Sequence, residues 1–489
     1  MKTLRFIIWS VLILGWLIAI LWAFITSQDG LGAVFCLSAI VTWITAGCIF
    51  GWIFGIKRHV KKHLRSNLDE SVELKYPPHP RDRQDVARAL EAICEASSDN
   101  QRLGLVSSVG SLLQLLRSNT QLSSLEWESF DVADNDWEEF PTNAVYLLTI
   151  DGLPCVAALV SPMYYDDDDT SGDSTYRKGT KRHLQIVANE KATCRLARRV
   201  ILDKAREVSA LRGKVIIVRP SGQRGEPEVA FSHIDEVDRS RIILPEHIFE
   251  AVNRTVLQQL AASETLKKAG QRTRTAILLF GPPGTGKTLL TRHLVSQSPG
   301  YTTILLQGFQ RELVRESFRL ARYLEPALVI LEDVDLIAVR RQRNRAGTTA
   351  LHALLDELDG LAPESRCAVI MTTNRPDVLE PALASRPGRV TQAIEFPKPN
   401  QAERADILRL FFKQVDHSQV SIEEWASKTD GASPAFLEEL VRRSILIAHG
   451  LDTADLPKIS DDHVRDAMHE IVTLGGTLTQ NLLGHSSET

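Results

Sequence analysis

Two long apolar stretches open the chain. Residues 6–25 are apolar except for Ser10, and residues 31–56 are interrupted only by glycines and a few serine and threonine residues. As helices rising about 1.5 Å per residue, both stretches are long enough to cross a hydrocarbon core of about 30 Å. The polar segment 27–30 between them reads Ser-Gln-Asp-Gly and is typical of a turn. We therefore expect residues 1–56 to form a transmembrane helical hairpin.

Basic residues gather at the two outer ends of this hairpin. Lys2 and Arg5 precede it and five lysines and arginines follow it between positions 57 and 65, whereas the turn carries only Asp29. By the positive-inside rule both ends face the cytoplasm. We expect a multi-pass protein of the bacterial inner membrane with cytoplasmic termini and membrane lipid as a partner. A cleaved signal peptide is the alternative for the first stretch, but its apolar core is longer than needed and a second span follows at once.

Helical and β-rich patterns alternate in the middle of the chain. A proline-rich segment at 76–80 cannot continue a helix and ends an expected basic juxtamembrane linker over residues 57–80. Residues 81–240 then predict a small α+β domain. Its expected helices are 83–95, 103–116 and 193–211, and its expected strands are 144–150, 155–160, 184–187 and 215–218. We interpret the four aspartates at 166–169 as a solvated loop, because adjacent carboxylates do not converge on one metal ion without a turn.

A glycine-rich octapeptide follows the apolar run 276–280 and opens a helical pattern. It reads Gly281-Pro282-Pro283-Gly284-Thr285-Gly286-Lys287-Thr288. The order of strand, loop and helix is the one that a phosphate-binding loop requires. Its glycines let backbone N–H groups surround phosphates, Lys287 neutralises the outer phosphates, and the Thr288 hydroxyl can bind Mg²⁺. We predict that all eight residues bind a nucleotide, with ATP and Mg²⁺ as cofactors.

A second strand-like run at 327–331 ends in two carboxylates, Glu332 and Asp333. In an open α/β sheet, ligands bind at the carboxyl ends of the strands. One carboxylate can hold the magnesium shell while its neighbour orients or deprotonates the attacking water. The pattern alone does not say which carboxylate takes which role; the resemblance described next implies that Glu332 serves the metal, through water, and Asp333 the attacking water.

Residues from about 241 to 472 resemble the AAA module, whose second region of homology corresponds to Thr372–Leu383 and continues through Ser385–Arg389. The resemblance implies that Asn374 senses the γ-phosphate and positions water. It also implies that Arg386 and Arg389 are arginine fingers that reach the nucleotide of a neighbouring subunit. A trans-acting arginine requires a homo-oligomeric ring, which we expect to be hexamer-like.

The same resemblance sets the expected domain limits. Residues 241–397 correspond to an α/β ATPase subdomain, and residues 398–472 correspond to a helical lid in which Gly431 and Ala432 would pack near the adenine. The tail 473–489 is small and polar and is expected to be disordered. The predicted fold is thus a P-loop NTPase with a parallel sheet and a C-terminal helical lid, preceded by a small α+β domain and the transmembrane hairpin.

Two features depart from the usual AAA pattern. Most members end the acidic strand in Asp-Glu, whereas Glu332 and Asp333 stand in the inverted order, which moves each carboxyl group by about 1.5 Å. The mitochondrial AAA proteins that assemble the Rieske iron–sulfur subunit share this order and are membrane-anchored ATPases, so we retain hydrolysis. The interval 308–318 lacks the aromatic-hydrophobic-glycine pore loop, and four arginines between 340 and 345 predict a basic central channel instead.

Composition removes several other classes of function. A net charge of −4 over 489 residues gives no reason to expect nucleic acid, which together with the anchor disfavours a DNA-handling AAA protein. Six scattered cysteines without a C-x-x-C pair suggest neither a zinc site nor disulfides. His469-Glu470 has no second histidine at the required spacing, which excludes a membrane-anchored AAA protease.

We predict an ATP hydrolase that remodels or chaperones a protein client at the membrane. The alternative is a nucleotide-switched oligomeric scaffold with little turnover.

Overall fold

The computed structural model describes residues 56–79, 82–105, 111–117, 122–133, 136–160, 183–221, 227–308, 310–336, 345–377, 389–449 and 456–474. Nearly all of the expected transmembrane hairpin, the arginines 340–343, Arg386 and the tail from 475 lie outside these ranges. Within them, no helix combines the length and hydropathy that a bilayer span requires. The chain divides at residues 210 and 211 into two compact units, which we call the first and the second unit.

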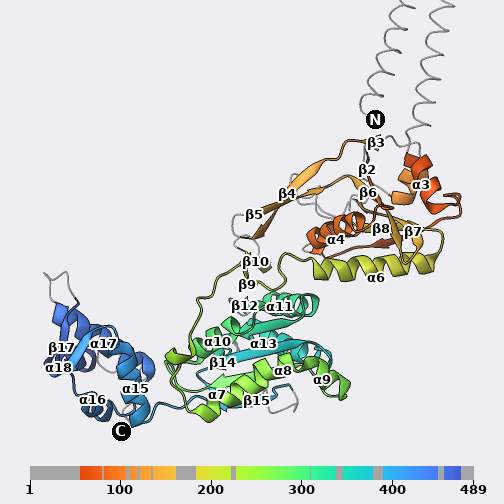
Figure 1. Ribbon diagram of the computed structural model, residues 1–489. Coiled ribbons are helices and arrows are strands. Elements are labelled where there is room, and N and C mark those ends of the chain that lie inside the picture. The colour runs from red at the N-terminus through yellow and green to blue at the C-terminus, as the bar shows by residue number, and fades with distance from the viewer. Residues whose placement is uncertain are drawn as a thin grey trace, which may run out of the picture. The chain divides into compact units, whose positions relative to one another are not determined.

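The first unit is built on a six-stranded antiparallel sheet with the order β1-β8-β7-β6-β2-β3. Its strands are β1 (Val72–Tyr76), β2 (Gln101–Leu105), β3 (Leu122–Ser123), β6 (Ala144–Ile150), β7 (Leu153–Val160) and β8 (His183–Ala188). Both faces are covered. Helices α4 (Arg83–Glu95) and α6 (Lys191–Glu207) lie side by side on one face (Figure 1), and α3 (Ile56–Leu64) and α5 (Leu112–Arg117) pack on the other. The central strand β6 is therefore almost entirely buried instead of alternating.

The structure corrects two expectations for this unit. Residues 57–80 are not a linker, because α3 buries Val60 and Leu64 and β1 pairs with β8 along its whole length. The positive charge of α3 favours a linker, but its apolar residues, which recur at every fourth position, form one buried face. The expected helix 103–116 is wrong as well, since it spans the end of β2 and most of α5.

The second unit contains a seven-stranded sheet with the order β10-β9-β12-β13-β14-β11-β15, parallel except for β10. The strands are β9 (Val215–Pro220), β10 (Pro227–Phe231), β11 (Thr275–Phe280), β12 (Thr302–Leu306), β13 (Ala327–Leu331), β14 (Cys367–Thr373) and β15 (Gln392–Glu395). The predicted strand 215–218 is β9, which belongs here and not to the α+β domain, because it pairs in parallel with β12. A β-rich pattern of residues predicts that a segment is a strand, but it does not predict which sheet the strand joins.

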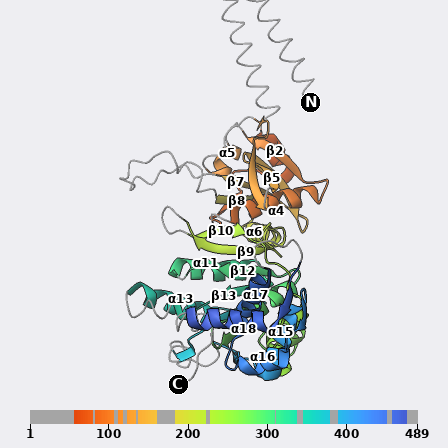
Figure 2. The same ribbon diagram turned by 90° about the vertical axis from the view of Figure 1, so that its left-hand side faces the viewer.

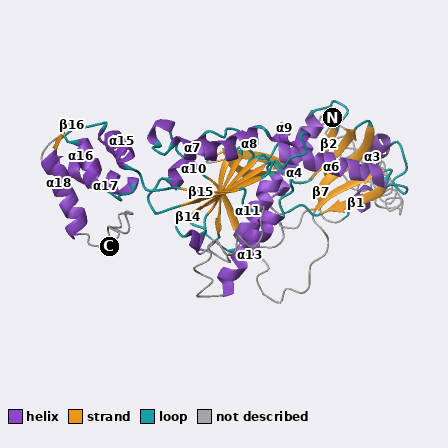
Figure 3. Cartoon of the chain, turned by 90° about the horizontal axis from the view of Figure 1, so that it is seen from below, coloured by secondary structure: helices purple, strands orange, loops and turns teal. Residues whose placement is uncertain are grey.

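Helices cover both faces of this sheet, as Figure 3 shows. One layer contains α7 (Glu246–Asn253), the π-helical turn η3 (Arg254–Gln258), α8 (Gln259–Ala261), α9 (Ser263–Lys268) and α10 (Lys287–Ser296). The other contains α11 (Arg311–Tyr323) and α13 (Arg345–Asp359). Leu290 and Leu294 of α10 join the core under the first layer, and Phe318 of α11 joins the core under the second. The buried strands β11, β13 and β14 lie between the two cores, as expected for a parallel sheet.

A bundle of short helices follows β15 and has its own core around Phe412, Phe436 and Leu437. It consists of α15 (Gln401–Phe412), α16 (Ile422–Lys428), α17 (Pro434–His449), α18 (Asp461–His469) and the π-helical turn η4 (Glu470–Leu474), with β16 (Asp416–Gln419) paired to β17 (Lys458–Ser460). The helices α15, α16, α17 and α18 gather closely in Figure 2. This bundle corresponds to the predicted lid.

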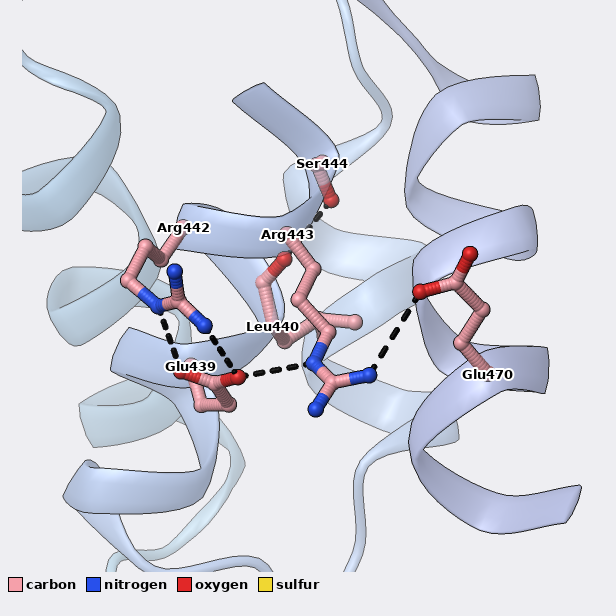
Figure 4. Close-up of polar contacts among 6 residues, drawn as sticks. All are labelled: Glu439, Leu440, Arg442, Arg443, Ser444 and Glu470. Carbon is pink, nitrogen blue, oxygen red and sulfur yellow. Dashed lines mark hydrogen bonds and ion pairs between the residues drawn. The ribbon is translucent and has the colours of Figure 1, made fainter. Parts of the chain in front are cut away.

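Ion pairs within α17 and between α17 and η4 stabilise the lid (Figure 4). Glu439 of α17 accepts hydrogen bonds from Nε of Arg442 and Nε of Arg443, each at 2.7 Å, and Nη1 of Arg443 also reaches Glu470 of η4 at 3.4 Å. The hydrogen bonds from Arg442 and, after it, from Arg443 lower the pKa of Glu439 to about 2. Glu439 therefore stays charged at neutral pH and holds Arg443, which links α17 to the turn after α18.

Candidate nucleotide-binding site

The segment 281–288 joins β11 to α10 in the predicted order of strand, loop and helix. Gly281 has φ +148°, and a Cβ atom there would lie 2.3 Å from the carbonyl oxygen of Phe396. Gly284 has φ +75°, and a Cβ atom there would lie 2.8 Å from Cβ of Ala435 in α17. Only glycine fits these two positions. The loop therefore packs closely between the segment after β15 and helix α17 of the lid.

A cavity of about 810 Å³ opens beside this loop. The segment from Pro283 to Leu289 forms one wall, and Asp333, Thr372 and Asn374 enter from the carboxyl ends of β13 and β14. These ends meet because β13 and β14 are adjacent parallel strands. Lid residues and Ser240 with Arg241, from the short 3₁₀ turn η2 (Arg239–Arg241), close the remaining side.

Lys287 places a cationic group against the loop. Its Nζ donates hydrogen bonds to the carbonyl oxygens of Gly281 and Pro282, both at 2.8 Å. Burial lowers the pKa of Lys287 to about 8, although the negative charges of Asp333 and Asp335 act in the opposite direction. A phosphate chain entering the cavity would supply the anionic acceptors that this buried ammonium group lacks.

The acidic side of the cavity is fixed by short polar contacts. Asp333 has φ +51°, a conformation that non-glycine residues adopt at a cost, and its N–H donates to Oγ1 of Thr372 at 3.1 Å. Its carboxylate accepts from Nδ2 of Asn374 at 3.1 Å. Buried Asp335 accepts from Oγ1 of Thr373 at 2.8 Å and from the N–H of Asn374 at 3.3 Å. Asp333 and Asn374 are thus held beside each other at the cavity wall.

Comparison with known proteins agrees with this geometry. Residues 277–398 match the model of the family described as "ATPase family associated with various cellular activities (AAA)". The chain contains an AAA ATPase domain. The phosphate loop, Asp333 and Asn374 all lie within or at the edges of the matched segment.

Several curated relatives share this domain. The chain is 34% identical over 241 residues to the 26S proteasome regulatory subunit 6A of Schizosaccharomyces pombe, covering 46% of this chain and 53% of that protein. It is 33% identical over 237 residues to the proteasome-activating nucleotidase of Methanothermobacter thermautotrophicus, covering 46% and 56%. It is 34% identical over 234 residues to the ATP-dependent zinc metalloprotease FtsH 3 of Sphaerobacter thermophilus, covering 45% and 46%. The chain thus spans about half the length of these relatives.

The side chains of the AAA domain suit the cofactors of an ATPase. The hydroxyl-bearing Thr288 lines the cavity, and Mg²⁺ prefers oxygen ligands of this kind. Lys287 would provide the positive charge for the outer phosphates. Glu332, which the sequence assigned to the metal, is exposed and is not among the residues that line the cavity. Of the two residues predicted to bind Mg²⁺, Thr288 lies at the cavity and Glu332 does not, whereas Asp333 supplies a carboxylate there that can act on the attacking water.

Other predicted residues fall in different places. Pro283, Gly284, Thr285 and Gly286 line the cavity, whereas Gly281 and Pro282 contribute the carbonyl groups that hold Lys287. Gly431 and Ala432 do not line it, and Ala432 is buried in the lid core. The lid instead contributes Leu410, Phe411, Lys413, Gln414, Pro434, Ala435 and Glu438.

Sequence reasoning also missed Ser240 and Arg241. These residues lie more than 30 positions before the phosphate loop, and no motif marks them as part of the cavity. Asp238 accepts a hydrogen bond from the N–H of Ser240 at 2.8 Å and caps the turn that carries both residues. An aspartate two residues before a serine is a weak capping signal, and it says nothing about what the turn approaches.

Arg389 of the AAA domain is not free to reach a neighbouring subunit in this structure. Its side chain is 5% exposed, and its Nε and Nη2 donate to Oδ1 and Oδ2 of Asp359 at 3.0 and 2.8 Å. The pair ties the start of the β15 segment to the last residue of α13. The implied finger role therefore does not agree with the observed position of Arg389, while Arg386 lies outside the described residues.

This pair leads to a prediction about stability. We expect Arg389→Ala to lower the free energy of unfolding by about 1–2 kcal/mol, because it removes the packing of a buried guanidinium group and its two charge-assisted hydrogen bonds to Asp359, which is 41% exposed. The control is Arg375→Ala, whose 3.4 Å pair with Asp377 is exposed and should contribute less than about 0.5 kcal/mol. Urea unfolding of the full chain in detergent measures both. An Arg389→Ala variant as stable as the wild type would show that the Arg389–Asp359 pair does not stabilise the fold.

Proposed function

We propose that the chain is an ATP hydrolase that couples turnover to the remodelling or chaperoning of a protein client at a membrane. The observation that carries the proposal is the cavity of the AAA domain, which brings Lys287, Asp333 and Asn374 together beside the phosphate loop. A charged ammonium group, a carboxylate and an amide are the groups that nucleotide hydrolysis requires at such a loop.

Each group has a role that follows from its position. Lys287 exchanges the carbonyl oxygens of Gly281 and Pro282 for phosphate oxygens and stabilises their charge. Asp333 accepts a proton from the attacking water, and Asn374, hydrogen bonded to Asp333, orients that water. Bound Mg²⁺ supplies Lewis-acid stabilisation of the phosphates. The left-handed backbone at Asp333 is consistent with a residue that is held in place for chemistry.

A protein client and a ring assembly complete the proposal. Among the relatives, one is named as a 26S proteasome regulatory subunit, one as a proteasome-activating nucleotidase and one as an ATP-dependent zinc metalloprotease. These names support the proposal that the client of this ATPase is a protein and not a small molecule. A homo-oligomeric, hexamer-like ring is supported by the sequence pattern around Arg386, which would complete the site of a neighbouring subunit.

The measurement that tests this function is steady-state release of phosphate from ATP by the purified full chain. Many turnovers per chain would support the proposed ATP hydrolase, which we call the motor. A second candidate, the nucleotide-switched scaffold, is favoured by one observation: Glu332 stays outside the cavity and leaves the shorter Asp333 to do the chemistry. Tight ATP binding with less than one turnover per chain over hours would support the scaffold and reject the motor.

The location at the bacterial inner membrane is also a proposal, supported by the two apolar stretches and their basic flanks. The inverted Glu332-Asp333 order adds a resemblance to the membrane-anchored Rieske-assembly proteins. In intact cells we expect Asp29→Cys to react with a membrane-impermeant maleimide, and Lys61→Cys to react only after lysis. The reverse pattern would reverse the topology. A chain that carbonate washing releases from membranes would reject the anchor.

A further inference from the structure

The first unit carries a β-hairpin with one packed face and one open face. Its strands β4 (Trp127–Ala133) and β5 (Asp136–Pro141) form a separate two-stranded antiparallel sheet. Residues directly opposite each other in such a pair project from the same face. One face carries the pairs Trp127 with Pro141 and Ser129 with Glu139, together with Trp137 two residues before Glu139, and the other carries Glu128 with Phe140 and Glu138 two residues before Phe140.

The second of these faces is fastened to the body of the unit. Phe140 is buried, and the guanidinium carbon of Arg88, on α4, lies 5.4 Å from the centre of its ring. Nε of the same arginine donates to Oε2 of Glu138 at 2.6 Å. One arginine thereby holds an aromatic and an acidic residue of the same face. The hairpin is anchored through this face, which leaves the opposite face available.

The opposite face presents two tryptophans and a carboxylate, and we call Trp127, Glu139 and Trp137 the outer hairpin face. Trp137 is 63% exposed and Trp127 is 49% exposed, whereas Trp425 in the lid is buried. Glu139 is exposed, lies two residues from Trp137 on β5 and is therefore displaced from it by about 7 Å along the strand. Large exposed aromatic side chains grouped on one face are typical of an interaction surface.

The charge of the hairpin indicates the chemistry of the partner. Between Glu126 and Glu139 the sequence contains seven acidic residues and no lysine or arginine. The structure already shows one cation on this surface, because the guanidinium carbon of Arg102 lies 5.2 Å from the centre of the Trp127 ring. Trp137 has a comparable ring with more exposed area. A cationic side chain can stack on such a ring while it pairs with the neighbouring carboxylate.

We propose that the outer hairpin face binds an extended segment of another protein that is rich in arginine or lysine. Successive cationic side chains of that segment stack on Trp137 and Trp127 and pair with Glu139. The identification of this partner as the client rests on the proposed function, but the binding step itself requires no ATP turnover. The hairpin thus recognises the client, and the AAA domain acts on it.

The test uses the full chain in detergent without nucleotide and a fluorescein-labelled nonapeptide of alternating arginine and serine, followed by fluorescence anisotropy. We expect Trp137→Ala and Glu139→Gln each to weaken binding by about tenfold, from the loss of a cation–π contact and of an ion pair. A matched peptide with glutamate in place of arginine should not bind. The control Asp151→Asn removes one negative charge from the β6–β7 turn of the same unit and should change affinity by less than about twofold.

Three results would overturn the proposal. Affinity that is unchanged in both Trp137→Ala and Glu139→Gln would place the peptide elsewhere on the chain. Equal weakening by Glu139→Gln and Asp151→Asn, with Trp137→Ala unaffected, would reduce the effect to general charge attraction. A change of oligomeric state in Trp137→Ala, measured by analytical ultracentrifugation, would make the face an interface between copies. If wild-type chain binds the peptide at this face but never hydrolyses ATP, the motor fails while the recognition site stands.

Discussion

Replacing Asp333 with asparagine should leave ATP binding almost intact and nearly stop hydrolysis. Asparagine keeps the size of the side chain and an oxygen that can accept the 3.1 Å hydrogen bond from Asn374, but it cannot take a proton from water. Loss of a positioned general base typically costs about 10²–10⁴ in rate. We expect kcat to fall at least about 100-fold and the ATP dissociation constant to change by less than about threefold, since the charge acts mainly in the transition state.

The neighbouring carboxylate provides a matched control. Glu332→Gln also removes one negative charge, but Glu332 is exposed and lies outside the residues that line the cavity. It should therefore reduce kcat by less than about tenfold. Steady-state phosphate release at saturating ATP gives both rates, and equilibrium binding of a fluorescent ATP analogue gives both affinities. If Glu332→Gln abolished turnover while Asp333→Asn did not, the catalytic carboxylate would be Glu332, and the assignment of Asp333 to the attacking water would be wrong.

Local patterns predicted the phosphate-binding part of the AAA domain well. The expected strands 276–280 and 327–331 correspond to β11 and β13, and the glycine-rich loop lies between β11 and α10. These features depend on residues that are adjacent in sequence, because a phosphate loop carries its strand, turn and helix signals within about 20 positions. The positions of Gly281 and Gly284 against Phe396 and Ala435 explain why those glycines are required there.

The features that could not be predicted depend on distant partners. β9 is a strand by its pattern, but only its pairing with β12 assigns it to the second unit. Arg389 lies 30 positions from Asp359, and nothing in its own motif indicates that the buried arginine pairs with this aspartate. Ala432 and Ala435 lie on the same stretch of the lid, yet only Ala435 reaches the cavity. Such distinctions are decided by tertiary packing, which overrides local propensity.

Binding of ATP at the phosphate loop can be tested through the charge of Lys287. Lys287→Ala removes the ammonium group that is buried against the loop, and Lys287→Met removes the charge while it keeps most of the side-chain volume. We expect either variant to raise the ATP dissociation constant at least about 100-fold, because one charge-assisted contact to phosphate contributes about 2–3 kcal/mol or more in a partly buried site. Lys268→Ala, at the exposed end of α9, is the control and should bind as the wild type does.

The most direct test of the account is therefore the equilibrium affinity of the full chain for ATP and Mg²⁺, measured by titration calorimetry for wild type, Lys287→Met and Lys268→Ala. Circular dichroism first establishes that all three are folded alike. The account predicts tight binding by the wild type and by Lys268→Ala, with binding lost in Lys287→Met. Equal affinity of all three proteins, or no binding by the wild type, would contradict the assignment of residues 281–288 and the cavity beside them as the ATP site.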